Sequence, residues 1–307
     1  MSDYSPIVLF VYSRLEHTKR TVDNLRKNEL AKLSELIVFS DGAKNENDKH
    51  EVFEVREYLK NINGFKNVAI IERKVNLGLA KNIQLGVSDV VNKYGKVIVL
   101  EDDIVTSPRF LEFMNSSLDY YKDYDKVWHI SGWNYPIDTI GLNDTFLWRG
   151  MNCWGWATWK DKWDKFEKNP SRLIVEWDKD KISRFNVDGS FPFWKQVESN
   201  ISGKIDTWAI FWYSTIFEHE GLCLNPTSSL VNNIGLDGSG ENCSKSTETL
   251  SSFTPLDRAL TLGSEKIEEN KIALERIKKY GIASSPTLFQ RAINRLNKTS
   301  FIKRIKR

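Results

Sequence analysis

Short apolar runs alternate with segments of helical periodicity across the first hundred residues, and this alternation constrains the fold more than any other feature. The apolar runs lie at 7–12, 36–39, 68–71 and 97–100. Apolar residues between them recur at helical spacing, first over 52–59 and then over 79–90. Unbroken apolar runs are typical of strands buried on both faces, and strands that alternate with helices form βαβ units. We therefore expect an α/β fold whose mostly parallel sheet is flanked by helices.

Local signals predict three further helices. One should begin at Ser107–Pro108, because serine caps helices and proline suits the first turn. A second should begin after Asp206, which would cap the aromatic segment 207–212. The charged segment 264–280 predicts the third.

Composition excludes several classes of protein. The chain has 307 residues, 40% hydrophobic and 28% charged, which is ordinary for a globular chain and argues against disorder or a coiled coil. It has no apolar run of about 18 residues, and its N-terminus lacks the pattern of a signal peptide. Its three cysteines, Cys153, Cys223 and Cys243, are too far apart for a disulfide framework or a CxxC metal site. A reducing cytoplasm is the expected location.

Positive charge gathers at the C-terminus. Residues 291–307 hold seven Lys or Arg and no acid, so the rest of the chain is about −4 (3 minus 7). This balance does not favour nucleic-acid binding. Apolar residues recur at near-helical spacing over 288–296, and a basic amphipathic helix is typical of a membrane-surface element. A peripheral contact with the inner face of the plasma membrane and a frayed soluble terminus both stay open.

Polar residues follow each of the four predicted strands. Arg14 follows the first, Asp41 the second, Asn76 the third and the acidic triplet 101–103 the fourth. In open parallel sheets ligands bind beyond the carboxyl ends of the strands. No GxGxxG follows the first strand and no GxxxxGK[ST] occurs, so dinucleotide-binding and P-loop folds lose their main support.

The triplet Glu101-Asp102-Asp103 is the sharpest chemical signal. Three carboxylates directly after a buried strand repel one another, and burial adds a desolvation cost. A hard cation such as Mn²⁺ or Mg²⁺ relieves both, because it prefers carboxylate oxygens and leaves positions open for substrate phosphates. A solvated acidic loop or a helix N-terminus is the alternative.

Three other strand-end groups have one functional and one structural interpretation each. In the functional interpretation the Arg14 guanidinium binds a phosphate, and in the structural one Arg14 is an ordinary surface residue. Asp41 suits the N–H of a base or belongs to a common Asp-Gly turn. The segment that contains Asn76 and Lys81 suits a nucleotide and its phosphate, or is a well-capped helix start.

The region 128–242 is rich in aromatic residues and loops, and all eleven tryptophans lie between Trp128 and Trp212. Asp206, beside three aromatic residues, suits a general base for a sugar hydroxyl. The tryptophans suit sugar rings, but core packing is their commoner fate, so we expect two or three near substrate and the rest in the core. The four histidines have no zinc spacing, and nothing indicates a hydrolytic triad.

The order of these motifs resembles the GT-A nucleotide-sugar glycosyltransferases, especially bacterial family 2-like enzymes. The acidic triplet and the later segments resemble the animal N-acetylglucosaminyltransferase I family more closely. Gly155–Trp156, Asp206–Trp208 and the glycine-rich loop 234–240 would correspond to its Gly-Trp segment, base motif and final loop. The resemblance covers roughly residues 6–243. It implies a GT-A, Rossmann-like sheet.

The resemblance also implies roles on the donor side. Asp103, with Glu101, would ligate the metal, and Asp102 would lie at the ribose or the donor sugar. Arg14 would contact the nucleotide and Asp41 its base.

On the acceptor side, the resemblance makes Asp206 the catalytic base. The residues expected near the acceptor or the donor sugar are Trp156, Trp208, Gly238 and Ser239.

Together these inferences predict a metal-dependent inverting glycosyltransferase. It would move a sugar from a nucleotide donor, UDP-linked by the Asp41 analogy, to a glycan or lipid-linked glycan in bacterial surface-polysaccharide synthesis. Residues 1–125 would bind the nucleotide sugar, 126–250 would form the acceptor region, and 251–307 a helical, basic tail. The alternatives are an inactive sugar-binding protein of the same fold and a sugar nucleotidyltransferase, although the latter usually has a glycine-rich loop after strand one.

Overall fold

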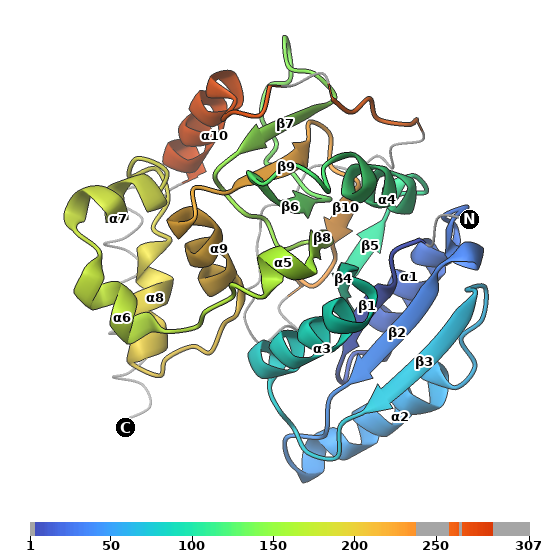
Figure 1. Ribbon diagram of the computed structural model, residues 1–307. Helices are drawn as coiled ribbons and strands as arrows, with labels where there is room; N and C mark the ends of the chain where they lie inside the picture. Colours follow the sequence, from blue (N-terminus) through green and yellow to red (C-terminus); the bar gives the residue numbers. More distant parts are fainter. Residues whose placement is uncertain (1–3, 238–257, 264–265, 285–307) are drawn as a thin grey trace.

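The computed structural model describes residues 4–237, 258–263 and 266–284 (Figure 1). Its main sheet has eight strands in the order β3-β2-β1-β4-β8-β6-β9-β7. These strands are β1 (Ile7–Val11), β2 (Glu35–Ser40), β3 (Asn67–Glu72), β4 (Lys96–Glu101), β6 (Val127–Ser131), β7 (Thr145–Trp148), β8 (Trp156–Trp159) and β9 (Leu222–Pro226). A small second sheet pairs β5 (Ile104–Thr106) with β10 (Val231–Asn233).

The main sheet is mostly parallel, which confirms the expected fold class. Only β7 and β8 run against the other six strands. The four strands expected from the apolar runs are all present, with ends within two residues of the predicted ones. In β1 every residue is buried, because the strand lies between β2 and β4 and has helices on both faces.

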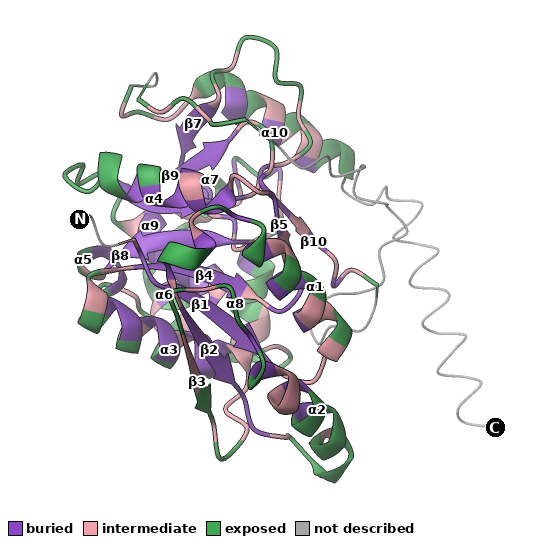
Figure 2. Cartoon of the chain, turned by 90° about the vertical axis from the view of Figure 1, so that its right-hand side faces the viewer, coloured by how far each residue is buried: buried purple, intermediate pink, exposed green. Residues whose placement is uncertain are grey.

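Helices cover both faces of the sheet. They are α1 (Leu15–Arg26), α2 (Lys49–Leu59), α3 (Leu79–Tyr94), α4 (Phe110–Tyr120), α5 (Lys160–Trp163), α6 (Pro170–Glu176), α7 (Lys179–Phe185), α8 (Trp194–Ile201), α9 (Ala209–Glu218) and α10 (Lys271–Ser284). Alternate residues of β1 point to opposite faces, so Leu9 packs with α1, α2 and α4, whereas Phe10 packs with α3. Figure 2 shows α3 on one side of β1 and β2, and α1 and α2 on the other.

The aromatic region completes the second half of the molecule. Helices α6 to α9 enclose a core cluster that includes Trp177, Phe185 and Trp194. Helix α10 packs on β7, where Phe146 and Trp148 meet Ile277. Because the sheet continues from β4 through β8 into β6, the two halves share one set of hydrogen-bonded strands. The predicted division at residue 125 falls in the turn before β6.

The three predicted helix starts need correction. Helix α4 begins at Phe110, whose amide donates to the Ser107 carbonyl, while the Ser107 hydroxyl has no partner among the described residues. Helix α9 begins at Ala209 without a side-chain cap, so Asp206 is not its N-cap. Helix α10 begins at Lys271, because the Asn270 side chain accepts from the Ala273 amide and starts the helix there.

None of the helices within the described ranges is long and apolar enough to cross a membrane. The basic segment 285–307 lies outside the described residues.

Candidate functional site

The ends of β1 and β4 bring one arginine and three carboxylates together. The two strands are parallel neighbours, so Arg14 and the triplet leave the sheet at the same edge. The Arg14 guanidinium donates to both Asp102 and Asp103, with 2.8 Å between Nη2 and Asp103 Oδ2. The predicted convergence of these residues is therefore confirmed.

The cluster has an excess of negative charge. Asp102 and Asp103 are 4% and 6% exposed, and Arg14 is the cation that pairs with both. Burial and the neighbouring carboxylates raise the pKa of Glu101 to about 8. Burial raises the pKa of Asp102 to about 6, although Arg14 opposes it. One guanidinium against three carboxylates leaves two negative charges to balance when all are ionised.

These residues fit a divalent cation held together with substrate phosphates. Their donor atoms are carboxylate oxygens, the ligands that Mg²⁺ and Mn²⁺ prefer. One or two protein carboxylates are enough where a substrate diphosphate completes the coordination. Over the described ranges, no three or more His, Cys, Asp or Glu side chains are gathered around one ion position. The Arg14 Nη1 is buried and has no partner among the described residues, so a donor is left for an anion.

A loop after β10 closes over Asp103. The Ile234 amide donates to the Asp103 carbonyl at 2.9 Å. Further along the loop, Asp237 Oδ2 lies 3.2 Å from His17 Nε2. A Cβ on Gly235 would lie 2.1 Å from Asp103 Oδ2 and 3.0 Å from Arg14 Nη1. Only glycine leaves room for the carboxylate and the guanidinium at this point.

The Asp41 carboxylate holds the loop that precedes α3. One oxygen accepts from the amides of Gly42 and Leu77, both at 2.9 Å. The other accepts from the Gly78 amide at 3.0 Å and from the Asn76 side chain at 3.3 Å. A carboxylate has about four acceptor positions, and these four donors of the chain fill all of them. The turn interpretation is thus confirmed, and the reading of a base by Asp41 stays a prediction.

The first turn of α3 lies beside this loop. Gly78 adopts a φ of +74° as the residue before the helix, a conformation that favours glycine. Lys81 is exposed in the first turn, so its ammonium is accessible to solvent and to an anion. The predicted helix start at 76–82 is confirmed.

Asp206 lies in a different environment from the one that its sequence neighbours indicate. Its side chain is 69% exposed and pairs with Lys168 instead of packing among the aromatic residues that follow it. The reason is that the helix begins three residues later, which turns Trp208 inward and leaves Asp206 in the preceding loop.

The tryptophans expected near the sugars are in the core. Trp156 and Trp208 are 1% and 3% exposed and stack on each other with ring centroids 5.1 Å apart. Their faces are covered, so neither is available to a sugar ring. Gly238 and Ser239 lie outside the described residues.

Sequence reasoning missed Trp133 and Trp154, which lie in the wall of a cavity of about 330 Å³. Their rings meet edge to face at 4.7 Å. Each is next to a glycine, and the Gly132 amide donates to the Gly155 carbonyl at 2.6 Å. A tryptophan next to a glycine at the end of a strand is the signal that could have found them.

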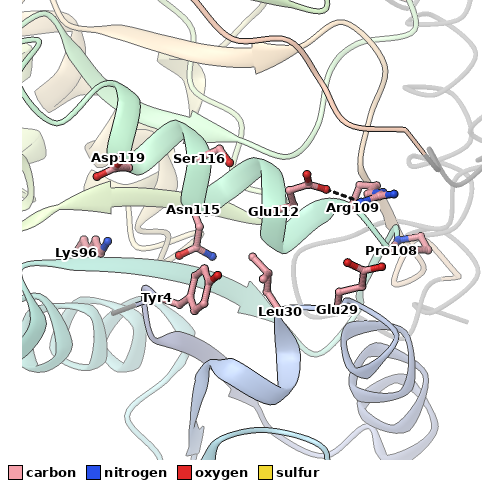
Figure 3. A pocket seen from close by; sticks show the side chains of 10 residues that line it. All are labelled: Tyr4, Glu29, Leu30, Lys96, Pro108, Arg109, Glu112, Asn115, Ser116 and Asp119. Carbon is pink, nitrogen blue, oxygen red and sulfur yellow. Dashed lines mark hydrogen bonds and ion pairs between the residues drawn. The ribbon is translucent and has the colours of Figure 1, made fainter. Parts of the chain in front are cut away.

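A larger cavity, of about 370 Å³, lies elsewhere in the fold (Figure 3). It separates Tyr4 and Leu30 from α4, where Arg109 pairs with Glu112 at 2.9 Å. Lys96, the first residue of β4, lines it, whereas the acidic triplet is at the other end of that strand. This cavity is therefore not at the carboxyl ends of the strands.

The family model that matches residues 1–184, more than half of the chain, is that of the GNT-I family. The chain belongs to the GNT-I family. It is thus a glycosyltransferase that uses a nucleotide sugar, as the resemblance implied. No curated protein matches it.

Two solved structures are similar over part of their length. One is the mannosyltransferase PcManGT from Pyrobaculum calidifontis in complex with GDP-Man and Mn²⁺, with 9% identity, a TM-score of 0.41, and coverage of 71% of this chain and 70% of that one. The other is TarS from S. aureus, with 14% identity, a TM-score of 0.30, and coverage of 38% of this chain and 20% of that one.

Proposed function

We propose that this glycosyltransferase is metal-dependent and inverting, and that its donor is a UDP-linked sugar. Its acceptor is a hydroxyl of a glycan or lipid-linked glycan in bacterial surface-polysaccharide synthesis. The observation that carries the proposal is the pairing of Arg14 with Asp102 and Asp103 at the end of β4, under Gly235.

In this proposal the donor diphosphate lies against the carboxylates. Asp103, with Glu101, would hold Mn²⁺ or Mg²⁺, and the bound cation would supply electrostatic stabilisation of the departing diphosphate. The buried Nη1 of Arg14 donates to a phosphate oxygen, which adds a second positive charge where negative charge develops. Asp102, which follows Glu101 at the same edge of the sheet, would meet the ribose or the donor sugar.

The loop before α3 accommodates the nucleotide. Asp41 fixes Asn76 and the following amides, and Lys81 presents its ammonium from the first helical turn. A helix N-terminus attracts phosphate, because its amides and its dipole favour negative charge. The choice of UDP rests on the resemblance at Asp41, and it requires the base to replace one of the four donors of the chain, of which the Asn76 side chain at 3.3 Å is the most distant.

Asp206 is the proposed general base. Its exposed carboxylate is accessible to an acceptor hydroxyl, and Lys168 keeps it next to a positive charge. It lies three residues before Ala209, which lines the cavity that contains Trp133 and Trp154. Proton removal from the hydroxyl as its oxygen attacks the anomeric carbon gives a single displacement with inversion.

The basic segment 285–307 would bring the enzyme to the inner face of the plasma membrane. Its sequence follows α10 directly, and the seven cations of 291–307 suit anionic lipid. A lipid-linked acceptor would be found at that surface.

Titration calorimetry with Mn²⁺ and UDP tests the metal site. We expect the wild-type chain to bind Mn²⁺ more tightly with UDP present, and Asp103→Ala to lose that binding. Asp164→Ala is the matched control, since Asp164 is an exposed acid that pairs with Lys160 at 2.6 Å. An unchanged titration in Asp103→Ala would overturn the metal assignment.

A further inference from the structure

Nine of the eleven tryptophans are buried in the core, and the two that are not share one cavity. These two are Trp133 and Trp154, and both are half-buried in its wall. Trp133 and Trp154 also pack against the core, but they are only partly buried, and the rest of each ring lines the cavity. Such a pair at a cavity is typical of a ligand site.

The cavity lining is aromatic and uncharged. Its volume of about 330 Å³ is at the small end of the range for ligand sites. Among the described residues it is lined by Trp133, Tyr135, Met151, Asn152, Cys153, Trp154, Phe193, Gln196, Ala209, Ile210 and Tyr213. No Asp, Glu, Lys, Arg or His is among them. An ionised ligand would find no counter-charge here, and its desolvation would be costly.

One polar group of the wall is left without a partner. Asn152 is 7% exposed, and its side-chain amide nitrogen has no hydrogen-bond partner among the described residues. The backbone of the same residue is fixed, because its carbonyl lies 3.0 Å from His129 Nε2. Trp212 Nε1 donates to the other ring nitrogen of His129, so His129 donates to the Asn152 carbonyl. A buried amide donor without a partner favours a ligand with a hydroxyl or carbonyl oxygen.

The cavity lies at the same edge of the sheet as the acidic triplet. Strand β8 pairs antiparallel with β4, with Trp156 opposite Val99. Residues 153–155, which precede β8, therefore run alongside the end of β4 and the start of the triplet. The start of α9, at Ala209 and Ile210, also lines the cavity, and Asp206 is three residues before Ala209.

We propose that this cavity binds one uncharged pyranose ring, the acceptor sugar of the reaction. Identifying the ring as the acceptor depends on the proposed function, but its binding does not. One indole of the pair stacks on the C–H face of the sugar ring and the other meets the sugar from the side, since the two indole planes are inclined by 68°. The amides of Asn152 and Gln196 bond its hydroxyls. An acidic sugar and a nucleotide diphosphate are excluded by the lack of cations in the wall, and the unpartnered amide of Asn152 disfavours a lipid chain.

Binding to the full chain, followed by tryptophan fluorescence and calorimetry, tests this proposal. The probes are the methyl pyranosides of glucose, galactose, mannose and N-acetylglucosamine, with methyl glucuronoside and farnesol as the charged and lipid alternatives. At least one neutral pyranoside should bind saturably, and the glucuronoside and farnesol should not. Farnesol binding in place of sugar, equal binding of the glucuronoside, or no binding by the four neutral sugars would each overturn the proposal.

Two variants locate the bound sugar. Asn152→Ala and Gln196→Ala should each weaken binding roughly five- to tenfold, as expected for one lost hydrogen bond. Gln84→Ala is the matched control, since Gln84 lies on α3, outside the cavity, and should leave binding unchanged. Because Gln196 is exposed on α8, its replacement keeps the fold even where that of buried Asn152 does not. Unchanged affinity in Gln196→Ala, with unchanged or unmeasurable affinity in Asn152→Ala, would place the sugar elsewhere and contradict the assignment.

Donor hydrolysis in the same preparation separates this inference from the proposed function. Hydrolysis of a nucleotide sugar without any pyranoside binding would refute the cavity assignment alone. Pyranoside binding that needs Asn152 and Gln196, without hydrolysis of any donor, would leave the sugar site and refute the proposed transfer.

Discussion

Replacement of Gly235 by alanine should disable the proposed donor site while leaving the fold intact. The added Cβ would lie 2.1 Å from Asp103 Oδ2, about 1.3 Å short of an ordinary contact of 3.4 Å (3.4 minus 2.1). It would also lie 3.0 Å from Arg14 Nη1. The loop or the carboxylate must therefore move by about an ångström. Gly235 does not have a positive φ, so the effect is steric and not a backbone strain.

A displacement of that size has a known scale in enzymes. Misplacement of a catalytic group by about 1 Å costs on the order of 10²-fold in rate, which corresponds to about 2.7 kcal/mol. We expect kcat/KM for the donor to fall by about that factor. The midpoint of thermal unfolding should change little, because the clash is relieved at the edge of the sheet and not in its core.

The matched control is Gly141→Ala, which should give the opposite result. Gly141 is exposed, has a φ of +78°, and has nothing within 4 Å of an added Cβ. Alanine there strains the backbone by about 1 kcal/mol and should lower stability slightly without affecting turnover. Metal-dependent turnover and Mn²⁺ binding as in the wild type for Gly235→Ala would refute the closure of this loop over Asp103.

Three further variants test the proposed general base and two titratable groups with shifted pKa values. Asp206→Asn should lose at least about 10²-fold in turnover with donor binding unchanged, and near-normal turnover would remove it as the base. Burial lowers the pKa of His129 from 6.5 to about 3. Between these two pH values the unfolded chain binds a proton at this histidine and the folded chain does not. Stability should fall by at most about 1.4 kcal/mol per pH unit from pH 6.5 towards 3, and His129→Gln should flatten that slope in chemical denaturation. Partial burial raises the pKa of Glu218, but the hydrogen bonds that it accepts from Arg172 and Trp177 outweigh burial and lower the pKa to about 2. Glu218→Gln should cost about 1.5–3 kcal/mol at neutral pH. That difference should shrink as the pH falls from 4.5 towards 2, and a constant difference would contradict the role of the ion pair.

The first half of the fold, residues 4–125, was predictable because most of its signals are local. An unbroken apolar run such as 97–100 can be satisfied only by a strand buried on both faces. A strand that ends at Glu101 places Asp102 and Asp103 at the carboxyl edge of the sheet. The parallel order of β1 and β4 then brings Arg14 to the same place. The strand signals are local, whereas this last step joins residues 88 positions apart and depends on the topology of the parallel sheet.

The aromatic region after residue 125 was harder to predict because burial there depends on tertiary packing. Trp156 and Trp154 are two residues apart, yet the first is in the core and the second lines a cavity. Trp154 precedes β8, and Gly155 between the two tryptophans has a φ of +59°, so their side chains do not follow the alternation of an extended strand. Asp206 has the sequence of an N-cap, but the helix begins at Ala209.

Asp41 shows the same limit for a single side chain. An Asp before a glycine predicts a turn, and the structure confirms that part. The amides of Leu77 and Gly78, more than thirty residues away, saturate the carboxylate. The position of that distant loop is needed to show that the Asp41 side chain holds the loop before α3 in place.

Release of nucleotide from a panel of UDP-, GDP-, dTDP- and CMP-sugars, each with Mn²⁺, Mg²⁺ or EDTA, tests the proposed metal-dependent donor site. We expect slow hydrolysis of a UDP-sugar that requires the metal and disappears with EDTA or in Asp103→Ala. Release that persists in EDTA, or that favours another nucleotide, would contradict the metal site or the UDP donor respectively. An absence of release from every donor, with no nucleotide raising the melting temperature, would contradict the donor site built from Arg14, Asp102 and Asp103.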